Sequence, residues 1–178
     1  MSVLVLFAHP SAHESRANVR FRDAAAAAED VEVRDLYALY PDLLIDVKAE
    51  QAAAETHDAV VFQHPLYWYS APSLVKKWLD EVLEMGWAYN VLSADPTALT
   101  GKTMASAVTT GAPRSEYEPG GWNGRSVSDF LLPFAGTAQF CGMSYAQPWV
   151  FYDTFSADDE KLAAAADEYV AWLRSLQD

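Results

Sequence analysis

Residues 62–81 read FQHPLYWYSAPSLVKKWLDE and carry the clearest structural signal of the chain. The apolar run Ala59–Phe62 is typical of a buried strand. Three consecutive aromatic residues, Tyr67–Tyr69, follow it, and a helix with an apolar stripe is predicted over Ala71–Met85. Bulky rings after the carboxyl end of a strand predict a wall for a flat aromatic ligand, such as a flavin. A hydrophobic dimer patch is the competing interpretation.

Strand and helix signals alternate along the rest of the chain. The predicted strands are Ser2–Phe7, Val31–Leu36, Ala59–Gln63, Lys102–Thr109 and Ala146–Tyr152. The predicted helices are Ser15–Ala28, Lys48–Glu55, Ala71–Met85, Ser126–Cys141 and a last helix capped by Ser156. This alternation predicts an α/β three-layer sandwich, with five parallel strands in the order 2-1-3-4-5 and helices on both faces. Pro148 predicts an edge or bulged position for the fifth strand.

Length and composition limit the function classes. The 178 residues suit a single domain over 1–178, and no apolar run approaches the roughly 20 residues of a membrane span. The formal charge of −13 argues against binding to nucleic acid or, unaided, to anionic lipid. The N-terminus is interpreted as a strand and not as a signal peptide, and the single Cys141 fits a reducing cytoplasm. The four histidines are not spaced as a metal set, so no metal is predicted.

A polar segment follows the first strand. Residues 9–18 read HPSAHESRAN, and Ser15 is a suitable N-cap for the helix that begins there. Free backbone N–H groups at a helix start bind phosphate, and Arg16 and Asn18 can add donors. The segment contains neither GxxxxGK[ST] nor GxGxxG. It therefore predicts a phosphate site of another kind, with an ordinary capped loop as the alternative.

A third unusual segment follows the fourth strand. Thr109–Ala112 reads TTGA, and the long loop Pro113–Gly124 comes next. Gly111 would let the backbone approach a ligand ring closely, and neighbouring N–H groups could stabilise negative charge on that ring. Tyr117 and Asn123 lie on the loop, where Tyr117 offers an O–H donor. The ends of strands 1, 3 and 4 are neighbours in the predicted order, so these three segments are expected to form one site.

Together these motifs resemble a known family. HPxxxxSxxN, HPLYWYSAPSLVKKWLDEV, TTG…Y…PGG and FxGTAQFCGM occur in the order found in flavodoxin-like NAD(P)H:quinone oxidoreductases. The likeness is greatest to the small ancillary oxidoreductases of glutathione-gated potassium efflux systems, and it covers nearly the whole chain. Each motif alone is weak to moderate evidence, whereas the ordered set is strong.

The resemblance implies a flavin, FMN before FAD, because the chain lacks the added C-terminal region of the FAD-binding relatives. Three groups of residues match the family's flavin-binding positions. By this resemblance the phosphate is held by His9, Ser15, Ala17 and Asn18. The ring system or ribityl chain is contacted by Pro65, Leu66, Tyr67, Trp68 and Tyr69. The ring edge is lined by Thr109, Thr110, Gly111 and Ala112.

The family's chemistry is a ping-pong reaction, in which NAD(P)H delivers a hydride to the flavin and a quinone or similar electrophile then receives it. Tyr117 matches the tyrosine that assists hydride transfer in mammalian quinone reductases. Asn123 stands where those enzymes have a histidine, and Ala112 stands where they have a second glycine. The resemblance therefore assigns catalysis to Tyr117 and Asn123, with the proton coming from Tyr117 or water. His64 is predicted to be structural.

Other functions and associations stay open at this point. A regulatory subunit docked on the cytoplasmic domain of a potassium efflux transporter is the main alternative, with the chain cytoplasmic or peripheral at the inner face of the membrane through that partner. A flavodoxin-type electron carrier is disfavoured, because the phosphate loop lacks a Ser/Thr-Gly-rich run. A receiver domain is discarded, because Gln63-His64 stands where its aspartate should lie. Apolar residues on the Ala71–Met85 helix and its exit predict a homodimer: Trp78, Leu79, Val82, Leu83 and Trp87.

Overall fold

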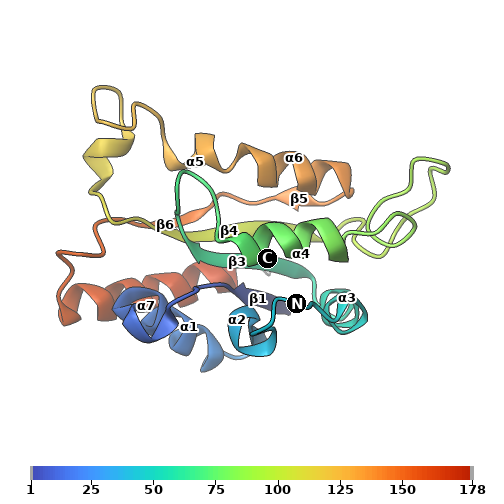
Figure 1. The fold of residues 1–178 in the computed structure, drawn as a ribbon, viewed down its shortest axis with the longest axis horizontal. Coiled ribbons are helices and arrows are strands. Elements are labelled where there is room, and N and C mark those ends of the chain that lie inside the picture. Colours follow the sequence, from blue (N-terminus) through green and yellow to red (C-terminus); the bar gives the residue numbers. More distant parts are fainter. Residues whose placement is uncertain (1, 177–178) are drawn as a thin grey trace.

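A computed structural model describes residues 2–176 and shows a twisted parallel sheet between two layers of helices (Figure 1). None of the helices within this range is both long and apolar enough to span a bilayer. The strands are β1 (Val3–Phe7), β2 (Val31–Asp35), β3 (Ala59–Pro65), β4 (Thr103–Thr109), β5 (Ser144–Tyr145) and β6 (Trp149–Phe151). The helices are α1 (Arg16–Ala26), α2 (Leu36–Leu39), α3 (Val47–Glu55), α4 (Ser73–Val82), α5 (Val127–Phe130), α6 (Leu132–Phe140) and α7 (Asp159–Ser175), with the 3₁₀ turns η1 (Ala12–Glu14) and η2 (Arg114–Tyr117).

The strands lie in the order β2-β1-β3-β4-β5, and β6 also pairs with β4. Every pairing is parallel; Val3 lies opposite Val31 on one side and Ala59 on the other. The predicted order 2-1-3-4-5 and the three-layer α/β architecture are therefore confirmed. The chain reverses its direction of winding between β1 and β3, so their carboxyl ends flank the crevice where ligands bind in such sheets.

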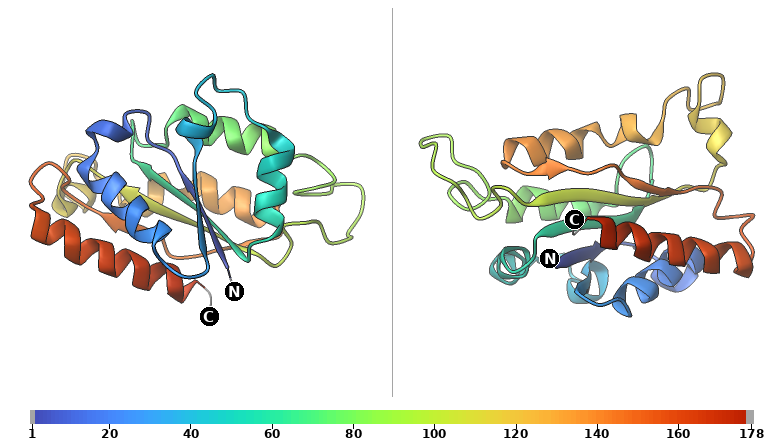
Figure 2. Two further views of the ribbon diagram at one scale, coloured as in Figure 1. Left: turned by 90° about the horizontal axis from the view of Figure 1, so that it is seen from below. Right: turned by 180° about the vertical axis from the view of Figure 1, so that it is seen from behind.

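Alternate residues of the sheet face two separate cores. Val3 and Val5 pack with α1 and α7, which lie side by side on one face (Figure 2). Leu4 and Leu6 pack with α4 and α6 on the other face. Residues of β1 and β3 are buried from end to end, because a parallel sheet covered on both faces needs apolar side chains at every position. This continuous burial fixes the strand ends that carry the polar loops.

Several predicted element boundaries were wrong, each for a local reason. The predicted helix Ser126–Cys141 is two helices, because the chain leaves helical geometry at Leu131 and restarts with Pro133 in the first turn of α6, where its missing N–H costs nothing. Ser156 does not cap α7: its hydroxyl donates to Asp153, and the N-cap is Asp158.

Two strand predictions also needed correction. Leu36 ends no strand; it begins α2 and is fully buried. The predicted fifth strand is the pair β5 and β6 at the sheet edge, with Pro148 between them. The prediction that Pro148 marks an edge position is confirmed, because both short strands pair only with β4.

Candidate functional site

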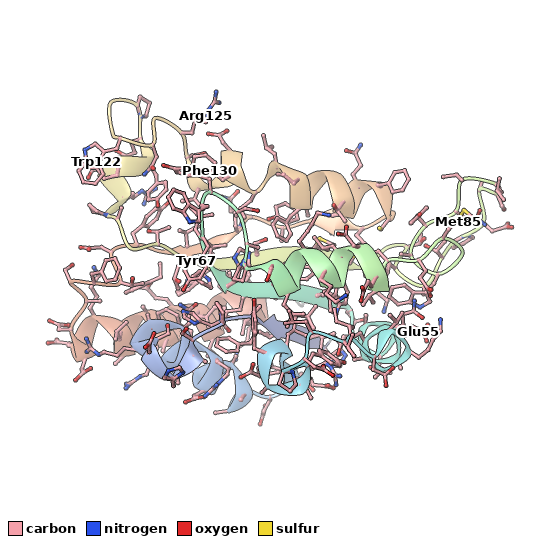
Figure 3. The ribbon with its side chains drawn as sticks, in the orientation of Figure 1. Glu55, Tyr67, Met85, Trp122, Arg125 and Phe130 are labelled. Atoms are coloured by element: carbon pink, nitrogen blue, oxygen red, sulfur yellow. The ribbon has the colours of Figure 1, made fainter. Side chains whose placement is uncertain are left out.

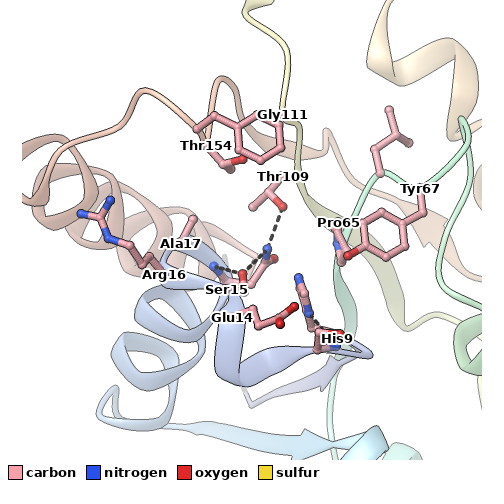
Figure 4. A pocket seen from close by; sticks show the side chains of 14 residues that line it. His9, Glu14, Ser15, Arg16, Ala17, Pro65, Tyr67, Thr109, Gly111 and Thr154 are labelled. Carbon is pink, nitrogen blue, oxygen red and sulfur yellow. Dashed lines mark hydrogen bonds between the residues drawn. The ribbon is translucent and has the colours of Figure 1, made fainter.

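The carboxyl ends of β1, β3, β4 and β6 meet at one edge of the sheet, around a cavity of about 420 Å³ (Figure 4). A volume of this size is within the range of small-molecule and cofactor sites. Segments far apart in sequence line the cavity. They contribute His9, Ser11, Glu14, Ser15, Arg16, Ala17, Asn18, Pro65, Leu66, Tyr67, Thr109, Gly111, Thr154 and Phe155.

The start of α1 presents backbone donors to this cavity. Ser15 is the N-cap, and its hydroxyl oxygen accepts the N–H of Asn18 at 3.3 Å. Among the described residues, no acceptor is found for the backbone N–H of Arg16 or Ala17. Unpaired N–H groups and the positive end of the helix dipole together favour an anion. This end of the cavity therefore suits a phosphate group.

Asn18 connects the helix start to the neighbouring strands. Its side-chain nitrogen donates to the Ser15 hydroxyl at 3.1 Å and to the Thr109 hydroxyl at 2.9 Å, while its backbone carbonyl accepts from Gln63 at 2.9 Å. Its Oδ1 atom is buried without a partner among the described residues. A buried acceptor without a donor is costly, so a hydroxyl-bearing ligand or a water molecule fits here.

His9 lines the floor of the cavity, and its imidazole ring is neutral. Burial lowers the pKa of His9, and this outweighs the nearby charges of Asp35 and Glu14, which raise it. Its Nδ1 atom accepts the backbone N–H of Ser11 at 3.2 Å, so the ring proton is carried by Nε2. His9 meets Tyr67 edge to face, with ring centroids 6.0 Å apart. The pair joins the polar floor to the aromatic wall.

The aromatic segment after β3 is a tight turn. Tyr67 and Ser70 exchange two backbone hydrogen bonds of 3.0 Å, and both residues between them, Trp68 and Tyr69, have left-handed backbone angles (φ of 48° and 61°). Such angles cost roughly 1–2 kcal/mol for each non-glycine residue. Tyr67 lines the cavity, whereas Trp68 is 94% exposed and lies outside it. The turn therefore holds the Tyr67 ring against the cavity at a conformational cost.

The end of β4 supplies the opposite wall. Thr109 and Gly111 line the cavity. Thr110 and Ala112 do not: the Thr110 hydroxyl donates to the Ala112 carbonyl at 2.8 Å, and Ala112 packs against the core. Thr110 also donates its N–H to Phe151 at 2.9 Å, which fixes this segment to β6.

Tyr117 and Asn123 belong to the segment between β4 and α5, which carries the labelled Trp122 and Arg125 (Figure 3). Tyr117 is 9% exposed and belongs to an aromatic cluster, with ring centroids 5.7 Å from Tyr152 and 6.5 Å from Phe130. Burial raises the pKa of Tyr117, so its hydroxyl is protonated at neutral pH. Asn123 is half-buried and donates its N–H to Glu116. Neither residue is part of the cavity lining.

Sequence reasoning missed the β6–α7 loop, which brings Thr154 and Phe155 to the cavity. The general rule that ligand contacts follow the carboxyl ends of parallel strands would have suggested this loop, because it follows the last strand. Its path, however, depends on a left-handed backbone angle at Asp153 (φ of 63°). Sequence alone does not indicate such an angle at a residue other than glycine.

His64 lies beneath the site in the core, as expected for a structural histidine. It is fully buried, stacks on Phe134, and makes a 2.9 Å hydrogen bond from Nδ1 to the Pro65 carbonyl, while its Nε2 has no partner among the described residues. Burial lowers the pKa of His64 from 6.5 to about 4. The ring is therefore neutral in the folded protein at neutral pH.

This burial predicts acid sensitivity. As the pH falls through 6.5 the unfolded chain binds a proton at His64, but the folded protein does not bind it until about pH 4. Stability is therefore lost on acidification, by about 2 kcal/mol between pH 7 and pH 5 from this residue alone. Urea titrations at both pH values should show this loss, and it should shrink in His64→Gln. An unchanged pH dependence in the variant would contradict the assignment.

Comparison with known proteins identifies the family. A family model described as flavodoxin-like fold matches residues 1–173. The chain belongs to the flavodoxin-like family. A curated relative, the glutathione-regulated potassium-efflux system ancillary protein KefF of Klebsiella aerogenes, is 45% identical over 94% of this chain and 92% of its own length. The resemblance inferred from the ordered motifs is thereby confirmed.

Solved structures of flavodoxin-like proteins superpose on the chain. General stress protein 14 of Treponema denticola, in complex with FMN, has a TM-score of 0.91 and 40% identity over 99% of both chains. An NADPH-quinone reductase of P. pentosaceus has a TM-score of 0.85 and 25% identity over 97% of this chain and 98% of that one. A protein described as a thermophilic tryptophan halogenase from Streptomycin violaceusniger has a TM-score of 0.88 and 47% identity over 93% and 95%. The names of these three proteins imply different activities, but their structures share one fold with this chain.

The cavity brings together nine of the 13 cofactor residues predicted from sequence. It leaves out Trp68, Tyr69, Thr110 and Ala112, as well as both predicted catalytic residues. The predicted residues that line it are His9, Ser15, Ala17, Asn18, Pro65, Leu66, Tyr67, Thr109 and Gly111.

The lining fits FMN by its own chemistry. One end offers the helix N–H groups of Arg16 and Ala17 for a phosphate. The buried Asn18 Oδ1 has no hydrogen-bond donor among the described residues, and a ribityl hydroxyl can supply one. The other end offers the Tyr67 ring and the Gly111 backbone for a flat ring system. An anion-binding end and an aromatic end in one cavity match the two parts of this cofactor.

Proposed function

We propose that the protein is an FMN-dependent NAD(P)H:quinone oxidoreductase, with a quinone or a related small electrophile as acceptor. The observation that carries this proposal is the cavity in which the N-terminus of α1 faces the same space as Tyr67 and Gly111. When bound, FMN supplies a two-electron centre that can take a hydride from NAD(P)H and give it to a quinone. FAD is the alternative cofactor.

The chain's own residues would bind and orient the cofactor. The free N–H groups of Arg16 and Ala17, the Ser15 hydroxyl and the helix dipole would hold the phosphate, beside Asn18, with neutral His9 donating from Nε2. Pro65–Tyr69 would contact the ring system or ribityl chain, and Thr109–Ala112 would lie along the ring edge, where backbone N–H groups stabilise negative charge. Trp68 and Tyr69 would contribute from the cavity mouth and Ala112 through its backbone N–H, while Thr110, whose N–H is bonded to Phe151, would hold the segment in place.

The comparisons support this assignment by analogy. FMN is bound by one neighbour of 40% identity, and another neighbour is named an NADPH-quinone reductase. A protein named as a halogenase has the same fold, so the fold alone does not distinguish a reductase from a halogenase. The agreement of the FMN complex and the quinone reductase favours reduction.

Steady-state kinetics test the proposal. FMN would fill the cavity of about 420 Å³, so NAD(P)H and the quinone would use the exposed face of the bound flavin in turn. Initial rates measured with NADPH at several fixed menadione concentrations should give parallel double-reciprocal lines. Intersecting lines would show that both substrates bind together and would contradict the alternating reaction.

We also propose that Tyr117 donates a proton or hydrogen bond during quinone reduction, with Asn123 as a second polar contact. Its raised pKa keeps the hydroxyl protonated at neutral pH. Tyr117→Phe is expected to lower kcat about tenfold, less than the roughly 100-fold of an irreplaceable proton donor, because water can substitute. FMN affinity should not change. Tyr152→Phe, in the same aromatic cluster, is the matched control, and an equal loss in both variants would contradict a specific role for Tyr117.

A homodimer built around α4 is proposed as the working form. Two of the five residues behind this prediction, Trp78 and Val82, are buried in the protein's own core and cannot serve an interface. Leu79 and Leu83 stay partly exposed and border a shallow groove that also includes Phe140, itself 62% exposed. Sedimentation velocity over a dilution series should give the mass of two chains, and Leu83→Glu should shift it to one. A wild-type protein that stays monomeric would contradict the dimer.

A second candidate function is an ancillary subunit of a potassium efflux transporter, with its redox activity secondary. The 45% identity to a protein named as such an ancillary component favours it. In this case the chain would act in the cytoplasm, beside the inner face of the membrane. Flavin binding without turnover of NADPH and quinone would favour this candidate over the first.

A further inference from the structure

Phe155 presents an unusual ring to the cavity. It is 90% exposed, yet it lines the same space as Tyr67, His9 and Gly111. Figure 4 shows Thr154 and Gly111 on one side of this space and Tyr67 on the other. A large apolar side chain at the mouth of a cavity gains free energy when a ligand covers it.

The loop that carries Phe155 is held firmly in place. The backbone N–H of Thr154 donates to Thr110 at 3.0 Å, and that of Asp153 donates to Ala112 at 3.1 Å. At the far end of the loop Arg16 donates to the Ala157 carbonyl at 3.3 Å and pairs with Asp159 at 2.7 Å. The ring is therefore presented by a loop fixed to both β4 and α1, and not by a free tail.

The Phe155 ring lies against the backbone of Gly111. A Cβ atom at position 111 would lie 2.5 Å from the ring carbon Cε2 of Phe155 and 3.1 Å from Cδ2. A side chain at position 111 would push the exposed Phe155 ring away, so glycine lets the ring lie against this part of the backbone. The same backbone forms the wall of the cavity after β4.

We infer that Phe155 packs on the ring system of the bound flavin, at the wall formed by Gly111. This inference rests on the proposed function and adds a binding residue from the β6–α7 loop. A flat ring entering the cavity would cover a side chain that is otherwise exposed, and aromatic pairs gain affinity beyond their buried area. The backbone of the loop is already held by hydrogen bonds to the segment after β4, which lowers the cost of ordering it when a ligand binds.

Flavin titrations followed by fluorescence test the inference without any turnover. Phe155→Ala is expected to weaken FMN binding about tenfold to hundredfold. It should weaken riboflavin binding by the same factor, because riboflavin has the ring system but no phosphate. Phe155→Tyr keeps the ring and should bind as the wild type does. Leu44→Ala removes a similarly exposed apolar side chain, 70% exposed and outside the cavity lining, and should have no effect.

Three results would overturn the inference. If Phe155→Ala binds FMN as tightly as the wild type, Phe155 does not contact the flavin, and the proposed function is untouched. If FMN binding falls but riboflavin binding does not, the residue acts on the phosphate end through Arg16 and not on the ring. If the wild type binds no flavin, both the inference and the proposed function fail. Thermal unfolding without flavin should be equal for all variants, since the replaced side chains are exposed.

Discussion

Replacing Glu50 by alanine is expected to lower the free energy of unfolding by about 3–5 kcal/mol. Glu50 is fully buried in α3 and is the centre of a polar cluster. Its carboxylate accepts hydrogen bonds from Arg34 at 2.7 Å, from the Tyr40 hydroxyl at 2.6 Å and from the Trp78 indole at 2.8 Å. These partners come from β2, the end of α2 and α4, so one carboxylate ties together three segments.

Removing the carboxylate would leave Arg34 without its buried partner, with only the more exposed Glu32 at 3.5 Å. Burial alone would lower the pKa of Arg34, but the hydrogen bond and charge of Glu50 raise it above its ordinary value. Burial and the same carboxylate raise the pKa of Tyr40 to about 12. In Glu50→Ala the Arg34 guanidinium, 19% exposed, stays charged and mostly buried, which is the costly outcome for a broken buried pair.

Urea unfolding followed by circular dichroism measures this effect. Glu32→Ala is the matched control, because Glu32 also faces Arg34, at 3.5 Å, but is 45% exposed. Its loss should stay within about 1 kcal/mol, as is usual for exposed ion pairs. A Glu50→Ala protein that loses less than the Glu32→Ala protein would show that the cluster is not a determinant of stability.

Ser15→Asp is expected to weaken FMN binding by about 100-fold or more while leaving the fold intact. Aspartate is as good an N-cap as serine, and its charge suits the positive end of α1. Its carboxylate would lie beside the N–H groups that we assign to the phosphate. Two like charges roughly 5 Å apart repel by about 3 kcal/mol at an effective dielectric constant of about 20, which exceeds a hundredfold in affinity.

Riboflavin makes this experiment specific. It lacks the phosphate, so its affinity should be the same in the wild type and in Ser15→Asp. Ser15→Asn is the neutral control of equal size and equal capping ability, and it should bind FMN nearly as the wild type does. The penalty in Ser15→Asp should also shrink at high salt. Equal losses for FMN and riboflavin would place the phosphate elsewhere.

The parts of the fold that follow from local sequence were predictable. The continuous apolar runs around Val3–Phe7 and Ala59–Phe62 identify buried parallel strands, and the order of the sheet follows from the alternation of elements. Ser15 could be recognised as an N-cap from its position before a helical segment. The structure brings the three segments predicted from sequence to one cavity.

The missed features depend on contacts between distant residues. Nothing in KAEQAAAE shows that Glu50 is buried, because its partners are Arg34, Tyr40 and Trp78 in other elements. Phe155 reaches the cavity only because its loop is bonded to Thr110 and Ala112. Such placements are set by tertiary structure, which periodicity and capping signals do not describe.

The central claim is that this cavity holds a flavin that exchanges electrons with a nicotinamide and a quinone. The most direct test is an anaerobic absorption spectrum of the purified protein with FMN, recorded after NADPH and again after menadione. The account predicts that the bound-flavin absorption bleaches with NADPH and returns with menadione. Flavin that binds but does not respond to either reagent would contradict the oxidoreductase assignment, and protein that binds no flavin would contradict the site itself.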